Sequence, residues 1–326
     1  MSTLTKQSTK YGPHAQRNGV LMYAVAAFLF SIGGIVAKAT MQSGVTPIEF
    51  AAIRALFAAV LLVVWVGLTN RPAFRVSRQE APRLAIYGMG IFLLTQLLYM
   101  TAINNLPVAI GTILGFMAIV NVAIWNWLRH RHRLDPSAAI AIALSIVGAM
   151  FITGIVSGQL SGNITVFGIA AGIGCSIALT AYWILGAQLQ RTRDATSLLM
   201  WAMLGIVTSW SIIQPWWNYP WSKITTSAPL FIDHGPSLPV WLLVLFVAIV
   251  GTALPFGLVL ASVARIGAQR AGIVGSLEPA FAAVVAFIAL GETLGLLQVA
   301  GGLLILLGIF VMEYAALRAH RDDAVA

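Results

Sequence analysis

The sequence contains ten apolar segments, each about as long as a helix that crosses a lipid bilayer. Crossing a hydrocarbon layer of ~30 Å takes ~20 helical residues. The composition supports this interpretation, since 59% of the residues are hydrophobic and only 9% are charged. The sequence therefore predicts an all-α integral membrane protein with ten transmembrane helices. The predicted spans cover residues 19–40, 46–69, 82–104, 106–128, 135–156, 164–189, 195–217, 239–263, 268–290 and 293–317.

Basic residues gather at alternate ends of these segments. Sixteen of the nineteen Lys and Arg residues fall into six clusters, and the intervening connections carry one cation, Lys223. Because cytoplasmic loops are enriched in Lys and Arg, both termini are predicted to be cytoplasmic. The clusters are Lys6, Lys10 and Arg17; Arg71, Arg75, Arg78 and Arg83; Arg129, Arg131 and Arg133; Arg191 and Arg193; Arg265 and Arg270; and Arg318 and Arg321.

The same clusters account for the net charge of +9. Cations in short loops beside anionic lipid act as topology determinants, so nucleic acid is not an expected partner. The single cysteine, Cys175, excludes an intrachain disulfide and a thiolate metal site. All five histidines lie in predicted tails or loops, which excludes an intramembrane histidine relay. The first apolar run is too long for a signal peptide and is expected to be retained.

Ten spans divide into two halves of five, and five is an odd number. Two similar halves must therefore cross the bilayer in opposite directions, as the inverted repeats of secondary transporters do. We predict a cytoplasmic tail over residues 1–18, one five-helix repeat over 19–156, a second over 164–317, and a cytoplasmic tail over 318–326.

Motifs in both halves resemble those of the EamA-type drug/metabolite transporters. The resemblance covers residues 19–317 and implies that helices three, four, eight and nine surround a central pathway. Phe30 stands where that family commonly has tryptophan, and the first half lacks the proline-to-Gly-Glu pattern, so the substrate class is not transferred. The motifs are the run from Phe30 to Lys38, Val45-Thr46-Pro47, Arg54-Ala55-Leu56, Tyr182-Trp183, Leu277-Glu278-Pro279 and Gly291-Glu292.

Glu278 lies about ten residues into the ninth predicted span. At 1.5 Å per residue it is ~15 Å deep, where a charge costs at least ~2.5–3.5 kcal/mol. Pro279 removes the backbone donor that would bond the Gly275 carbonyl, which predicts a helix break at these two residues. A carboxyl group beside such a break is suited to contact a substrate or to exchange a proton. The alternative is a structural Glu that is permanently protonated or paired.

Arg54 and Lys38 are cations near the outer ends of the second and first spans. Both are candidate substrate contacts, and Arg54, which lies ~10 Å inside by helical rise, could bind a substrate carboxylate with bidentate geometry. The alternatives are snorkelling or pairing with a carboxylate for Arg54, and snorkelling alone for Lys38. Glu292, before the tenth span, is interpreted as a helix start signal.

Tyr99, Asn121 and Trp125 are the candidate side chains that line the pathway, because the resemblance places helices three and four around it. Such residues favour a substrate with an apolar or planar portion. The alternative for each is a helix–helix contact or an anchor at the membrane interface.

The expected function is secondary transport by alternating access, most simply export of amino acids or related metabolites across a bacterial cytoplasmic membrane. An uptake permease for a small organic solute or amine is the alternative. No phosphate loop, HExxH pair or GxSxG elbow is present, and no acidic ring suggests a channel, so an enzyme or channel is a distant alternative. The expected partners are a small-molecule substrate and the bilayer, with protons as candidate coupling ions and a homodimer as a candidate assembly. No cofactor or metal is expected.

Overall fold

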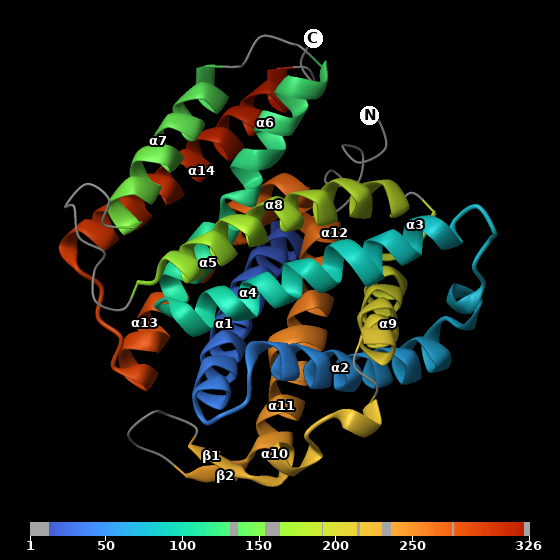
Figure 1. The fold of residues 1–326 in the computed structure, drawn as a ribbon. Helices are drawn as coiled ribbons and strands as arrows, with labels where there is room; N and C mark the ends of the chain where they lie inside the picture. The colour runs from blue at the N-terminus through green and yellow to red at the C-terminus, as the bar shows by residue number, and fades with distance from the viewer. Residues whose placement is uncertain are drawn as a thin grey trace.

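The computed structural model describes residues 13–130, 136–153, 164–190, 192–213, 216–229, 236–275 and 277–322. Helices make up most of this part, and one short hairpin lies at the bottom of Figure 1. Lys6, Lys10, Arg131, Arg133 and Arg191 lie outside the described residues. The α-helices are α1 (Pro13–Gln42), α2 (Pro47–Thr69), α3 (Ala81–Ala85), α4 (Leu93–Asn105), α5 (Val108–Phe116), α6 (Ala118–His130), α7 (Pro136–Thr153), α8 (Val166–Leu189), α9 (Ala195–Ile213), α10 (Trp221–Thr225), α11 (Val240–Ala248), α12 (Leu254–Gly275), α13 (Glu278–Leu290) and α14 (Leu296–Asp322).

Two π-helical segments and two short 3-10 turns complete the helical part. The π-helical segments are η3 (Ile86–Phe92) and η6 (Ile249–Ala253), and the 3-10 turns are η2 (Arg71–Phe74) and η5 (Trp216–Asn218). Strands β1 (Ser227–Pro229) and β2 (Ser237–Pro239) pair antiparallel, with Ala228 opposite Leu238.

The described residues include six apolar helices long enough to cross a membrane and four shorter ones. Their order along the chain follows the ten predicted spans, and the prediction of a multi-pass helical membrane protein is confirmed. The four shorter helices fall below the ~20 residues that a crossing takes. The exact number of crossings and the side on which the termini lie therefore stay predictions.

Helix starts follow local capping rules. Thr46 precedes α2, its hydroxyl accepts from the Glu49 backbone N–H, and the Glu49 carboxylate accepts from the Thr46 N–H. This reciprocal pair satisfies two donors that a helix start leaves free. Thr165 caps α8 with a single bond, in which its hydroxyl accepts from the Gly168 N–H.

The boundary predicted between spans 239–263 and 268–290 is wrong. Helix α12 continues through that region to Gly275, and α13 begins at Glu278. Arg265, which suggested a loop, instead donates to the Ala261 carbonyl one turn earlier within the helix. The helix yields at the proline, because Pro279 has no N–H to continue the ladder.

Helices of the first half of the chain pack against helices of the second half. Helix α1 packs against α12 and α13, and α4 and α5 pack against α8. Three further contacts join helices at corresponding places in the two halves, namely α2 with α9, α5 with α13 and α7 with α14. Contacts of this kind fit two structurally similar halves related by a pseudo-two-fold axis.

One close backbone approach between the halves lies where α1 meets η6. A Cβ atom added at Gly33 would stand 2.5 Å from the Cα of Gly251. Only glycine at both positions lets the two backbones come so close. The π-helical segments η3 and η6 both occur in the third predicted span of their half, and π-bulges of this kind are frequent at functional sites.

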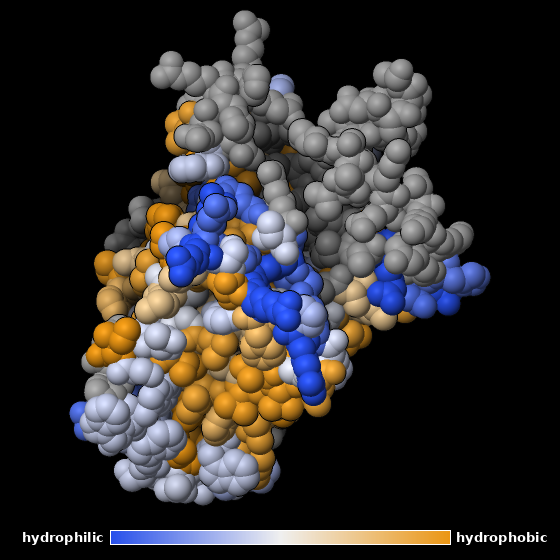
Figure 2. Space-filling view, turned by 90° about the vertical axis from the view of Figure 1, so that its right-hand side faces the viewer, coloured by the Kyte–Doolittle hydropathy of each residue, from blue (hydrophilic) through white to orange (hydrophobic). Residues whose placement is uncertain are grey.

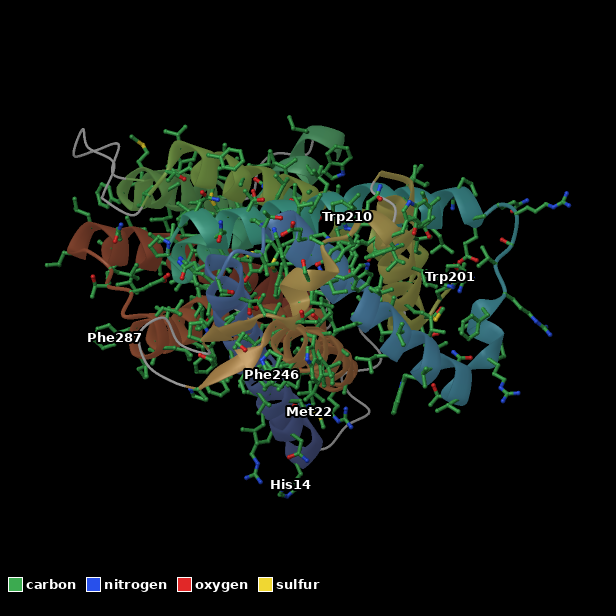
Figure 3. The ribbon with its side chains drawn as sticks, turned by 60° about the horizontal axis from the view of Figure 1, so that its bottom comes forward. His14, Met22, Trp201, Trp210, Phe246 and Phe287 are labelled. Atoms are coloured by element: carbon green, nitrogen blue, oxygen red, sulfur yellow. The ribbon has the colours of Figure 1, made fainter. Side chains whose placement is uncertain are left out.

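The molecular surface carries a broad apolar area. On the face in Figure 2, hydrophobic residues fill the space between strongly hydrophilic residues above and weakly polar residues below. Phe287 of α13 lies at the edge of the molecule, and Trp210 of α9 lies nearer the middle (Figure 3). Phe287 is 61% exposed, as a side chain facing lipid is. An apolar surface on this scale is typical of a face that contacts the membrane or another protein.

Candidate functional site

A cluster of polar side chains lies between the two halves of the chain, among α1, α2, α4, α5, η6 and α13. Arg54 of α2 contributes the cation, and only 6% of this residue is exposed. Its Nη1 donates to the Thr252 Oγ1 of η6 at 3.1 Å. Its buried Nε has no hydrogen-bond partner among the described residues. A buried donor without a partner is costly, and a ligand carboxylate would satisfy it.

Tyr99 of α4 lies at the centre of this cluster. Its hydroxyl is 3.4 Å from the Thr112 Oγ1 of α5, and it interacts electrostatically with both Glu278 and Arg54. Gly34 of α1 lies beside this hydroxyl, because a Cβ there would stand 3.4 Å from the Tyr99 oxygen. The predicted residues Arg54, Tyr99 and Glu278 are thus brought into one region.

Glu278 is the first residue of α13, directly after the helix break. Its backbone carbonyl accepts a 3.1 Å hydrogen bond from the Ser31 hydroxyl, near the middle of α1. Gly275, the last residue of α12, lies so close to the Tyr23 ring that a Cβ there would be 2.7 Å from the Tyr23 oxygen. Pro279 is buried. The carboxyl group of Glu278 forms no ion pair within the described residues.

Lys38 lies apart from this cluster, at the far end of α1. Its ammonium is 2.5 Å from the Glu292 carboxylate and donates to the Leu106 carbonyl at 2.5 Å. Glu292 also accepts from the Val108 N–H at 2.9 Å. The interpretation of Glu292 as a helix start signal is wrong, because Gln298 accepts from the Gly295 N–H at the start of α14 instead.

Asn121 and Trp125 are not part of the central cluster in this structure. The Asn121 amide donates to the Ser176 Oγ of α8 at 3.0 Å, a contact between two helices. Trp125 is 48% exposed. Both residues follow the interruption at Met117, where α5 ends and α6 begins a new helix.

Three further members of the cluster, Ser31, Thr112 and Thr252, were not predicted from the sequence. Each is a single hydroxyl in an apolar helix, and such residues usually bond their own helix backbone. Thr252 alone carried a usable signal, because it follows Gly251 in a span that also contains Pro255.

A second contact between the halves lies at the end of the bundle where the basic loops gather. Arg193 holds Glu80 through two hydrogen bonds of 2.6 and 3.1 Å and also donates to the Ala73 carbonyl at 2.6 Å. Its guanidinium lies 5.8 Å from the centroid of the Trp201 ring, on α9 in Figure 3. The hydrogen bond from Arg193 holds the pKa of the Glu80 carboxyl below its ordinary value of 4.5.

Comparison with known proteins identifies the family. A sequence profile of the EamA-like transporter family matches residues 17–154 and again residues 166–314. The chain belongs to the EamA-like transporter family. The two matches, one in each half, show the two-repeat architecture of that family, and membership makes the chain a membrane transporter of small molecules.

Several relatives extend along nearly the whole chain. An uncharacterized inner membrane transporter of Salmonella typhimurium, YicL, is 25% identical over 94% of this chain and 98% of its own length. The threonine/homoserine exporter RhtA of Escherichia coli is 25% identical over 88% of this chain and 90% of its own length. One crystal structure superposes on this chain with a TM-score of 0.58 at 16% sequence identity. The match covers 92% of this chain and 98% of the chain in that structure, which shows a shared fold.

Proposed function

We propose that this protein is a secondary carrier that exports amino acids or closely related small metabolites across the cytoplasmic membrane. One observation carries the proposal. Arg54, a buried cation with an unpartnered Nε, and Glu278, a carboxyl group outside any described ion pair, both interact with the Tyr99 hydroxyl. A cation and a carboxyl group that both act electrostatically on one hydroxyl fit the carboxylate and ammonium of an amino acid. The similarity to an amino-acid exporter supports the direction of transport.

Arg54 and Glu278 come from different halves of the chain, and this arrangement fits an alternating-access mechanism, in which the halves move relative to each other. Arg54 and Tyr99 belong to the first predicted repeat, and Glu278 belongs to the second. Rocking of inverted repeats around a central site would change the distance between these groups. The break between Gly275 and Glu278 and the π-helical segments are the places where the helices can yield most easily.

Ion pairs at both ends of the bundle fit the same mechanism. Arg193–Glu80 joins the halves at the end with the basic loops, and Lys38–Glu292 joins them at the other end. With both termini cytoplasmic, as the positive-inside rule predicts, the first pair faces the cytoplasm. Opening to either side would then require the pair on that side to separate. We include proton exchange at Glu278 in the proposal as the step that couples transport to the proton gradient. Assembly as a homodimer stays a prediction.

The test compares metabolites released by cells that express the wild type, Glu278→Gln or Arg54→Lys, at equal membrane levels. Untargeted mass spectrometry of the medium should show one class of amino acids enriched by the wild type alone. Gln cannot carry the charge, and Lys cannot present the bidentate guanidinium, so each variant should lose at least ~10-fold of the export rate, about 1.4 kcal/mol.

Glu49→Gln is the matched control, because Glu49 is a helix-start carboxylate paired with Lys223 and not a member of the cluster. It should retain export. Equal export by the wild type and both cluster variants would contradict the assigned roles, and solute gained inside the cells would indicate uptake instead.

A further inference from the structure

A polar cavity opens at the end of α1 that carries Lys38, away from the central cluster. Its volume is about 400 Å³, which accommodates a small amino acid with water. Lys38 and Glu292 form part of its lining, together with the polar side chains Gln42, Asn104, Asn105 and Thr165. Lys38 follows Ser31 by seven residues, or ~10 Å of helix, so the cavity lies about two turns beyond the central cluster.

Both halves of the chain build this cavity. Gln42, Asn104 and Lys38 come from the first half, and Glu292 comes from the link between α13 and α14. The side chains of Gln42 and Asn104 form no hydrogen bond with another described residue, which leaves their amide groups available to a ligand. A polar cavity between two halves that move during transport is suited to bind a solute on its way across the membrane.

The lining carries one buried charge of each sign. The side chains of Lys38 and Glu292 are 7% and 11% exposed, and each also binds a backbone group, the Leu106 carbonyl and the Val108 N–H. Removing one partner of a buried pair leaves the other charge uncompensated, which is strongly unfavourable. A ligand can therefore separate the two side chains only if it supplies both charges at once.

The chemistry of the ligand follows from this requirement. A zwitterion offers its carboxylate to Lys38 and its ammonium to Glu292, so both charges stay paired. A simple amine would pair with Glu292 and leave Lys38 without an opposite charge, and a simple acid would leave Glu292 without one. The amides of Gln42 and Asn104 can bind polar groups on the remainder of the molecule.

We propose that this cavity is a second substrate site, in which a zwitterionic α-amino acid takes the place of the Lys38–Glu292 contact at the mouth of the pathway. The inference rests on the proposed function, because it assumes that the transported solute is an amino acid. Insertion of the zwitterion separates α1 from the α13–α14 link. The substrate itself thereby loosens the contact that joins the halves at this end.

The experiment measures binding of radiolabelled L-threonine to the purified full-length protein in detergent. Two double variants separate the sites. Arg54→Gln with Glu278→Gln disables the central cluster, and Lys38→Met with Glu292→Met removes the pair at the mouth without leaving a lone buried charge. Threonine amide, a cation, and N-acetylthreonine, an anion, serve as competitors.

The central double variant is expected to retain threonine binding, with at least ~10-fold weaker competition by the amide and the N-acetyl compound. Adding the Met pair to that variant should weaken the remaining binding at least ~10-fold. Asn104→Leu in the same background removes only an amide of the lining and should weaken it by roughly 2- to 10-fold. This variant keeps the test valid even if the Met pair disturbs folding.

The outcomes separate the two proposals. If the wild type binds threonine but the central double variant does not, the second site is refuted and the central one stands. Competition by the amide and the N-acetyl compound as strong as that by unlabelled threonine also refutes the second site. If the wild type binds no zwitterionic amino acid, threonine included, more tightly than it binds the two competitors, the proposed function fails together with this inference.

Discussion

Replacing Glu292 by Gln should destabilise the protein more than removing the whole Lys38–Glu292 pair. The two charged groups are 2.5 Å apart and nearly excluded from solvent. At an effective dielectric constant of ~20 their attraction is about 7 kcal/mol, which offsets a desolvation penalty of several kcal/mol for each ion. Glu292→Gln cancels the attraction but leaves the Lys38 ammonium buried with the Leu106 carbonyl alone. We expect a loss of about 3–5 kcal/mol in the free energy of unfolding.

The double variant Lys38→Met, Glu292→Met removes the attraction and both desolvation penalties together. Its free energy of unfolding should lie within about 1 kcal/mol of the wild type or above it. Unfolding in mixed detergent micelles can be followed through the fluorescence of the ten tryptophans. If the double variant loses as much stability as the two single variants combined, the two side chains are not coupled and the reasoning is refuted.

Two further predictions concern the contacts between the halves. Gly33→Ala should lower both transport and the free energy of unfolding, by about 1–3 kcal/mol for the latter, because the added Cβ would stand 2.5 Å from the Gly251 backbone. Gly90→Ala, whose Cβ meets nothing within 4 Å, is the control, and an equal loss in both would contradict the close approach. For Glu80, the folded-state pKa lies below the ordinary value of 4.5 because Arg193 hydrogen-bonds the carboxylate. The contact therefore stabilises the protein above the unfolded-state pKa, and its contribution disappears as the pH falls through the folded-state pKa. The difference in unfolding midpoint between wild type and Glu80→Gln should shrink from about pH 7 to about pH 3, and a difference independent of pH would argue against this origin.

The three ion pairs of the described residues share one feature, which is that each joins segments far apart in the sequence. Glu80 meets Arg193, Lys38 meets Glu292, and Glu49 meets Lys223. Sequence spacing predicts pairs only within one helix, at three or four residues apart. No such spacing offered Lys38 a carboxylate, so substrate contact or snorkelling was expected of it, although the fold provides a buried partner in Glu292.

The central cluster was predictable in part. Arg54 and Glu278 stood out because a charge in an apolar span is costly and must have a reason. The helix break between Gly275 and Glu278 followed from the chemistry of Pro279. The partners Ser31 and Thr112 were not predictable, because an isolated hydroxyl in an apolar helix carries no mark of what it faces across an interface.

The sequence by itself determined that this chain is a multi-pass helical membrane protein of two similar halves, because hydrophobic length, charge distribution and family motifs are local properties of the chain. The tertiary structure decided which polar groups meet. It joined Asn121 to Ser176, left Trp125 half-exposed, and brought Arg54 and Glu278, from opposite halves, within electrostatic range of Tyr99. Such contacts depend on the packing of different helices against one another, and no periodicity within a single helix encodes them.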